Sequence, residues 1–286
     1  MNNITIKNTA KIFNNEYVIK EEREDLLDTY KYLLSRSFDY FPEIIKTNEK
    51  EFYYKFIEDV KEPKEEKLLD LLNLLSLLHS KTTFFKEIDI DYYKEIYENI
   101  KNKINDTKKY YNDLMDIIDN TIYMSPSNYL LARNSTIIFN AIEYANRKID
   151  LWYELIANKR KIRMVTIHNN ATLNHYIKGT KPYLISWNKS KIDMPIYDII
   201  SVYKNHYLEF DFVEELKLYF NKYPFTEEEM ILFLTILSIP EKIKYHENEY
   251  QTVTNIRKII DYIYKTSALV EAYDLKEENI YQEKNK

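Results

Sequence analysis

The sequence predicts an α+β protein, with a small β-rich part at the N-terminus and a large helical part after it. Short alternating apolar runs dominate residues 1–60, whereas apolar residues at helical spacing dominate the rest. A break at Glu62-Pro63-Lys64 separates the two patterns, because proline interrupts regular structure. We therefore expect a small lobe of sheet plus one helix over residues 1–60 and a helical lobe over residues 61–286.

The N-terminal residues Ile4 to Glu21 have the pattern of a small antiparallel ribbon. Apolar runs at 11–13 and 17–20 flank Asn14-Asn15, and asparagine tolerates the left-handed backbone of a tight turn. The helical spacing of Leu and Tyr residues then predicts a helix over residues 22–36. Two further strands are expected at residues 42–46 and 51–57, where apolar and aromatic residues cluster.

Seven helices are expected in the second part, and the starts of two of them are marked. Ser125-Pro126 precedes one helix, and Thr226 with Glu229 has the pattern of a capping box. Residues 163–186 revert to short apolar runs, which predicts one or two strands around a loop. The expected helices cover residues 65–79, 92–120, 127–158, 196–207, 212–223, 227–238 and 252–272.

Composition excludes several classes of protein. The formal net charge of -5 lacks the basic footprint of a nucleic-acid binder, and the absence of cysteine excludes disulfides and thiolate metal sites. The longest apolar stretch, Leu68 to Leu78, is interrupted by polar residues and is too short to span a bilayer. The first residues also lack a signal-peptide pattern. We expect a cytoplasmic protein whose partner, another protein or a small molecule, is left open.

The chain contains a single glycine, Gly179. Glycine-rich phosphate loops need residues without a Cβ where the backbone meets the phosphate. This sequence cannot build such a loop, so a bound nucleotide would lack that cradle.

Residues 163–190 have the outline of a phosphotransferase active site without its carboxylates. In kinase-like enzymes an Asp of the catalytic loop takes the hydroxyl proton, and an Asn and a second Asp hold Mg²⁺. Those three places read Asn170, His175 and Ser186 here. An amide cannot act as a base, and a hydroxyl is a poor substitute for a Mg²⁺-binding carboxylate. The pattern predicts that ordinary chemistry has been lost.

Several short motifs in a fixed order carry a resemblance to a known family. They are Tyr17-Val18-Ile19-Lys20, Leu78-His79-Ser80, His168-Asn169-Asn170, Ile185-Ser186-Trp187 and Pro195-Ile196-Tyr197-Asp198. Together they resemble the aminoglycoside phosphotransferase and choline kinase family, which has a protein kinase-like fold. The resemblance is greatest to the branch that includes spore coat protein S-like proteins, with a degenerate active site.

This resemblance implies roles for particular residues. Lys20 would contact nucleotide phosphates, with Glu24 or Asp28 as its paired acid, and Glu58 and Asp59 would lie at the hinge between the lobes. The implied cofactors are ATP and Mg²⁺, although the residues at the metal positions are poor Mg²⁺ ligands. His168 would orient the loop, or act as its base, and Asp198 would accept backbone hydrogen bonds beneath it.

Three functions remain open, and the first is favoured. The chain is a kinase-like pseudoenzyme that serves as a binding or regulatory module. Alternatively, it is an atypical ATP-dependent phosphotransferase with an alcohol-group acceptor, which would take its base and metal ligands from elsewhere, such as Asp193 or the hinge acids. The third possibility, a coat- or envelope-associated structural protein, depends on the resemblance alone.

Overall fold

The computed structural model describes residues 4–7, 10–48 and 51–274 of the chain. Over these residues the chain forms eight α-helices and ten β-strands, which confirms the predicted α+β class. It groups into two compact units, one of residues 1–85, 163–206 and 214–224, the other of residues 86–162, 207–213 and 225–286. The lobe boundary predicted at residue 60 is a different division that falls inside the first unit, and it stays a prediction.

The first unit contains an antiparallel sheet in the order β1-β2-β3-β5-β4. Its strands are β1 (Ile4–Lys7), β2 (Ala10–Phe13), β3 (Tyr17–Glu21), β4 (Ile44–Asn48) and β5 (Glu51–Lys55). Asn14 and Asn15 have φ of 50° and 55° between β2 and β3, so the predicted ribbon with left-handed asparagines in its turn is confirmed. The strand expected at residues 42–46 begins later, at Ile44, and has a bulge before Lys46.

The helix expected from Glu22 begins only at Leu26, as α1 (Leu26–Ser35). Tertiary contacts explain the difference, because the side chains just before it are used elsewhere. The Arg23 guanidinium donates to the carbonyl of Ser190 at 2.7 Å, and Glu22 lies 3.6 Å from the Lys20 ammonium. Helical periodicity cannot reveal such contacts in advance.

Eight further elements follow this sheet in the sequence and lie wholly or partly in the first unit. They are α2 (Lys64–Thr82), β6 (Phe84–Glu87), β7 (Lys161–Ile167), β8 (Tyr176–Lys178), β9 (Pro182–Leu184), β10 (Lys191–Asp193), α5 (Ile196–His206) and α6 (Phe212–Lys222). β10, β7 and β6 form one sheet, and β8 pairs with β9 in a hairpin. The prediction of one or two strands over residues 163–186 was wrong, because β7, β8 and β9 all lie within or overlap this range. Strands of three or four residues are too short for alternation to show.

Two short 3₁₀ turns, Leu173–His175 and Trp187–Lys189, lie in the loops that flank the β8–β9 hairpin. Trp187 is fully buried. The centroid of its ring lies 6.1 to 6.3 Å from the ring centroids of Tyr30, Phe38 and Phe41. Its indole N–H donates to the Leu184 carbonyl at 2.8 Å. This aromatic core fixes the backbone next to Ser186.

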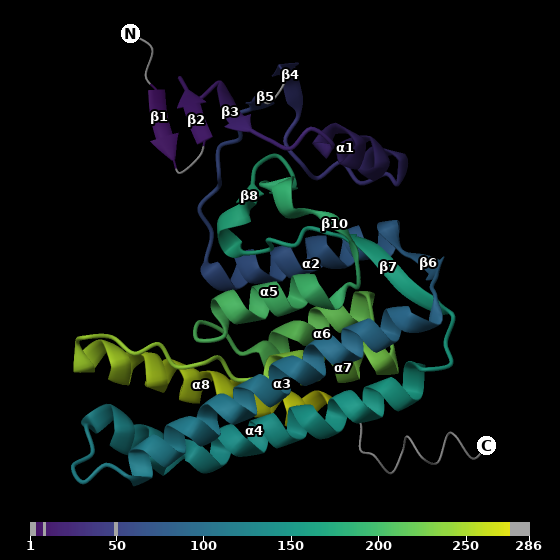
Figure 1. Ribbon diagram of the computed structural model, residues 1–286. Helices are drawn as coiled ribbons and strands as arrows, with labels where there is room; N and C mark the ends of the chain where they lie inside the picture. The colour runs from purple at the N-terminus through teal and green to yellow at the C-terminus, as the bar shows by residue number, and fades with distance from the viewer. Residues whose placement is uncertain (1–3, 8–9, 49–50, 275–286) are drawn as a thin grey trace. The chain divides into compact units, whose positions relative to one another are not determined.

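The second unit is built from four helices, α3 (Ile90–Asp119), α4 (Pro126–Ile156), α7 (Glu227–Ser238) and α8 (Glu249–Tyr273). α4 contacts each of the other three (Figure 1). The capping box of Thr226 and Glu229 is confirmed at the start of α7, and the Ser125 hydroxyl caps α4. No helix in the described part of the chain is long and apolar enough to cross a membrane.

Candidate functional site

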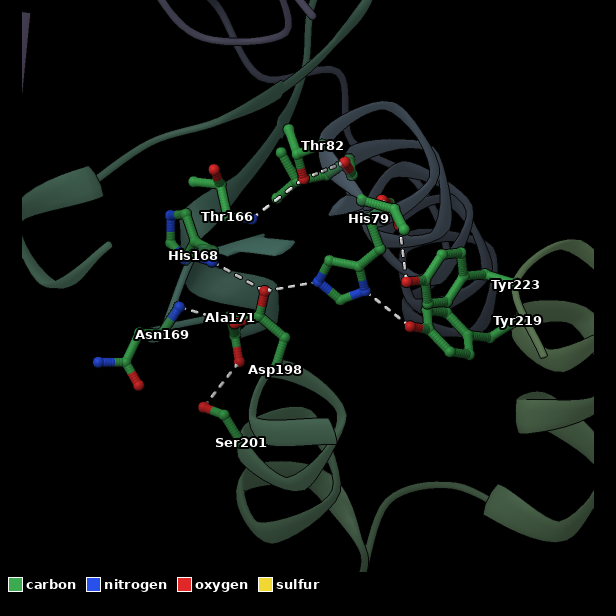
Figure 2. A network of polar contacts seen from close by, with 12 residues as sticks. His79, Thr82, Thr166, His168, Asn169, Ala171, Asp198, Ser201, Tyr219 and Tyr223 are labelled. Carbon is green, nitrogen blue, oxygen red and sulfur yellow. Dashed lines mark hydrogen bonds and ion pairs between the residues drawn. The ribbon is translucent and has the colours of Figure 1, made fainter. Parts of the chain in front are cut away.

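The loop after β7 is held from below by one buried carboxylate. Asp198, in the first turn of α5, is fully buried. It accepts the backbone N–H of His168 at 2.8 Å and that of Asn169 at 2.6 Å, as Figure 2 shows. Asn169 has φ of 56°, a left-handed conformation that asparagine tolerates. The prediction that Asp198 accepts backbone hydrogen bonds beneath the loop is therefore confirmed.

A third donor reaches Asp198 from α2. The His79 Nε2 lies 3.1 Å from the Asp198 carboxylate, and its Nδ1 lies 2.6 Å from the Tyr219 hydroxyl. A carboxylate only accepts hydrogen bonds, so the His79 Nε2–H donates to Asp198. α2, α5 and α6 are thereby joined through one polar chain beneath the loop.

The His168 side chain is buried beneath the loop and hydrogen-bonded across it. The ring is fully buried, and its Nε2–H donates to the Ile185 carbonyl at 2.8 Å. Burial lowers the pKa of His168 to about 4, because a charged ring would be desolvated. The centroids of the His168 and Trp187 rings lie 4.8 Å apart, and the two rings meet edge to face. Of the two roles expected for His168, the structure supports the orienting one.

Asn170 and His175 are joined to each other. The His175 Nδ1–H donates to the Asn170 carbonyl at 2.7 Å, because a carbonyl oxygen can only accept. This bond uses one of the two nitrogen atoms that could bind a metal. His175 lines the cleft described below, whereas Asn170 is absent from its lining.

Ser186 contacts the strand lysine directly. The Lys20 Nζ donates to the Ser186 Oγ at 3.0 Å, and Ser186 has a left-handed backbone with φ of 67°. The acid next to Lys20 is Glu22, whose carboxylate lies 3.6 Å away and whose side chain is 2% exposed. Burial raises the pKa of Glu22, and the charge of Lys20 only partly opposes this shift.

The expected pairing of Lys20 with Glu24 or Asp28 is therefore wrong. Asp28 lies on the exposed face of α1, where it pairs with Lys31 at 3.0 Å, and Glu24 is exposed in the turn before α1. Residues two apart on an extended chain face the same side. That rule points from Lys20 to Glu22 and was the signal that the sequence prediction overlooked.

A cleft of about 540 Å³ brings several of the predicted residues together. Its lining includes Lys20, Glu58, Asp59, His175 and Ser186, together with Glu22. Asp59 is engaged at the hinge, where it accepts the Lys178 N–H at 2.9 Å and pairs with Lys67 at 3.0 Å. Asp193, the other carboxylate considered, pairs with Lys191 at 2.6 Å and is not part of the lining.

The residues at the metal positions do not fit Mg²⁺. Mg²⁺ prefers carboxylate and water oxygens in octahedral geometry, whereas these positions offer an imidazole and a hydroxyl that already accepts from Lys20. Across the described residues, no group of three or more His, Asp or Glu side chains could hold a metal ion. We therefore derive no catalytic step through a metal at this cleft.

Two further side chains that hold the loop were not predicted. The His206 Nε2 accepts the Leu173 N–H at 3.2 Å, and the Tyr219 hydroxyl completes the chain through His79. Both come from helices distant in sequence from the loop, so no local pattern marked them.

The single glycine lies where the β8–β9 hairpin meets the hinge. The Val60 N–H donates to the Lys178 carbonyl at 2.8 Å, which holds the two segments close together. A Cβ added to Gly179 would lie 2.6 Å from the Ile57 Cγ2, closer than real Cβ contacts allow. The close approach of Ile57 therefore favours a residue without a Cβ at this position.

Replacing Gly179 with alanine is expected to lower the free energy of unfolding by about 1–3 kcal/mol, because the added methyl overpacks the hinge. Urea unfolding of the parent, Gly179→Ala, Ile57→Ala and the double variant, which together form a double-mutant cycle, would measure this loss of stability. The double variant should lose less stability than the two single losses combined. Strictly additive losses would show that the two positions do not clash.

Comparison with solved structures shows the same fold in phosphotransferases. An aminoglycoside phosphotransferase from Alicyclobacillus acidocaldarius matches with a TM-score of 0.68 and 8% identity, over 94% of this chain and 92% of that chain. Spectinomycin phosphotransferase bound to AMP matches with a TM-score of 0.56 and 12% identity, over 93% of this chain and 92% of that chain. No protein-family model and no curated protein matches the sequence.

These likenesses define a class of fold. The chain has the protein kinase-like fold of the aminoglycoside phosphotransferases, as its motifs predicted. At such low identity the likeness extends to the fold alone, since one fold supports many functions. The spore coat protein S-like branch stays a prediction.

Proposed function

We propose that this chain is a kinase-like pseudoenzyme, a phosphotransferase fold that serves as a binding or regulatory module without phosphotransfer. The observation that carries the proposal is the contact of the Lys20 Nζ with the Ser186 Oγ at 3.0 Å. By the family resemblance, Lys20 would face phosphates and residue 186 would be a metal-binding carboxylate. Here a hydroxyl takes that place and accepts from the lysine.

The other two chemical positions support the same proposal. Loss of a general base alone typically costs about 10²–10⁴-fold in rate, and the base position is the amide residue Asn170. His175 donates to the Asn170 carbonyl, which makes this pair a support of the loop. The loop scaffold around Asp198 is intact, whereas positions 170, 175 and 186 carry no carboxylate.

The second candidate is an atypical phosphotransferase with an alcohol-group acceptor. It is favoured by the cleft itself, which keeps Lys20 in its lining and has a size suited to a small ligand. It requires a base and metal ligands other than those at positions 170, 175 and 186, and Glu22, Glu58 and Asp59 are acids in the cleft lining. The coat- or envelope-associated role and the cytoplasmic location stay predictions from the sequence.

We expect the purified chain to transfer no phosphate from ATP to small alcohols above the level of its Lys20→Ala variant. The assay would offer choline, ethanolamine and aminoglycosides with Mg²⁺. In parallel, the shift of the melting temperature with ATP or ADP should be the same with Mg²⁺ and with a chelator, because no carboxylate pair holds the ion.

The Ser186→Asp variant is the matched comparison, since it places one carboxylate beside Lys20. Its nucleotide-induced shift should become larger with Mg²⁺ than without. Turnover by the parent chain that requires Mg²⁺ and disappears in Lys20→Ala would refute the pseudoenzyme proposal and establish the second candidate.

A further inference from the structure

The end of the helical unit where α3 passes into α4 exposes large apolar side chains. Ile122 is 90% exposed, Tyr123 is 89% exposed and Ile117 is 63% exposed. Met124 and Tyr129 are also exposed, at 44% and 60%. Isolated exposed apolar residues are ordinary, but five within thirteen positions are a concentration of the kind found at interaction sites.

The first turn of α8 belongs to the same surface. The Glu249 carboxylate accepts the Ser127 N–H at 2.7 Å, which joins the start of α8 to the start of α4. The next residue, Tyr250, is 76% exposed. Figure 1 shows the α3–α4 turn and the start of α8 at the same end of the helical unit. We call Ile117, Ile122, Tyr123, Met124, Tyr129 and Tyr250 the helical tip.

The charged side chains on the last turns of α3 are all acidic. Asp113, Asp116 and Asp119 are exposed on the last turns of α3, and no Lys, Arg or His occurs between Tyr110 and Arg133. In a chain with 41 basic residues out of 286, such a gap is notable. On the segment before α8, Lys242 lies over the Tyr110 ring of α3 at 5.5 Å from its centroid, one turn before Asp113, and Lys244 is exposed.

The position of these carboxylates is unfavourable for the helix itself. A helix C-terminus carries partial negative charge, so acidic side chains there destabilise it. α3 has no basic residue in its last turn, and Asp116 and Asp119 add charge of the same sign. Residues that oppose local stability are typical of a surface kept for binding.

We propose that the helical tip is a docking surface for a cationic amphipathic segment of a partner protein. The apolar side chains would receive the apolar face of that segment, and the three aspartates with the α3 C-terminus would attract its Lys and Arg residues. An anionic membrane surface or a nucleic acid would be repelled by the same charges. The proposal is independent of the cleft, so Lys20→Ala should leave docking unchanged.

The test uses the full chain and a labelled amphipathic peptide of about 18 residues, with Lys on one face and Leu on the other. Fluorescence anisotropy should show saturable binding that weakens as salt is added, because the charges are exposed. A peptide with Glu in place of Lys is the matched probe and should not bind. Equal binding of the two peptides would overturn the proposal.

Three variants locate the binding. The double variant Ile122→Ser/Tyr123→Ser should weaken peptide binding by about tenfold or more. The control variant Tyr264→Ser removes a side chain that is 57% exposed elsewhere on α8, and it should leave peptide binding unchanged. Asp116→Asn/Asp119→Asn should weaken binding while its melting temperature is unchanged or higher, which separates lost docking from lost folding. Unchanged affinity in the Ile122→Ser/Tyr123→Ser variant would refute the proposal.

Two other occupants are outcomes of the same experiment. Binding to phosphatidylserine vesicles that the Ile122→Ser/Tyr123→Ser variant loses would identify a membrane surface as the occupant. Self-association in sedimentation that the same variant abolishes would identify a second copy of the chain. Either result would overturn the proposal of a cationic partner segment.

Discussion

Replacing Asp198 with alanine is expected to destabilise the chain by about 3–5 kcal/mol, the range found when one partner of a buried charged network is removed. The carboxylate is fully buried and accepts from the His168 N–H, the Asn169 N–H and the His79 ring. Without it, the buried His168 N–H and His79 ring and the partly buried Asn169 N–H lose their acceptor, and an unsatisfied buried donor costs free energy. Urea unfolding followed by circular dichroism would measure the loss.

Two comparisons make this result specific. Asp28→Ala removes a carboxylate that is 79% exposed on α1 and should change stability by less than about 0.5 kcal/mol. Asp198→Asn keeps the shape and one acceptor oxygen, so its loss should lie between the two. If Asp198→Ala were as stable as Asp28→Ala, the carboxylate would not be what holds the loop.

Acid is expected to destabilise the chain through His168. Burial lowers the pKa of this ring to about 4 in the folded chain from its ordinary value of 6.5. Between pH 6.5 and 4, His168 is protonated in the unfolded chain but not in the folded chain. The free energy of unfolding therefore falls as the pH drops toward 4, and the contribution of His168 to this fall levels off below pH 4. A shift of this size corresponds to roughly 3 kcal/mol.

The contribution of His168 can be separated from that of other groups by substitution. The His168→Gln variant cannot titrate, so its free energy of unfolding should fall less steeply between pH 6.5 and 4 than that of the parent. His246→Gln removes an exposed histidine before α8 and should leave the slope unchanged. Identical slopes in the parent and His168→Gln would mean that the ring is protonated in the folded chain.

These two expectations concern the same structural point. The groups that hold the catalytic-type loop, Asp198, His79 and His168, are buried and hydrogen-bonded. The positions at which chemistry would occur, Asn170, His175 and Ser186, carry no carboxylate. The residues that hold the loop are therefore different from those at the three chemical positions, so substitutions at the chemical positions can leave the fold in place.

Much of the fold could be predicted from local signals. The long helices follow from their apolar spacing, the start of α7 from Thr226 and Glu229, and the β2–β3 turn from Asn14-Asn15. The short strands β6 and β10 could not be predicted, because three or four residues hold too few alternations. The start of α1 was misplaced because Arg23 is held by Ser190, far away in the sequence.

The amino-acid sequence by itself determined the order of the N-terminal ribbon and the long helices, and the lack of a glycine-rich phosphate loop. These follow from composition and periodicity, which are local properties. The residue types at the three chemical positions were found through the family resemblance of short motifs. Only the tertiary structure decided that Lys20 lies beside Ser186 and that His79 reaches Asp198. Partners more than a hundred residues apart, such as Lys20 with Ser186 and His79 with Asp198, are selected by packing, because burial leaves each polar group only the neighbours that the fold supplies.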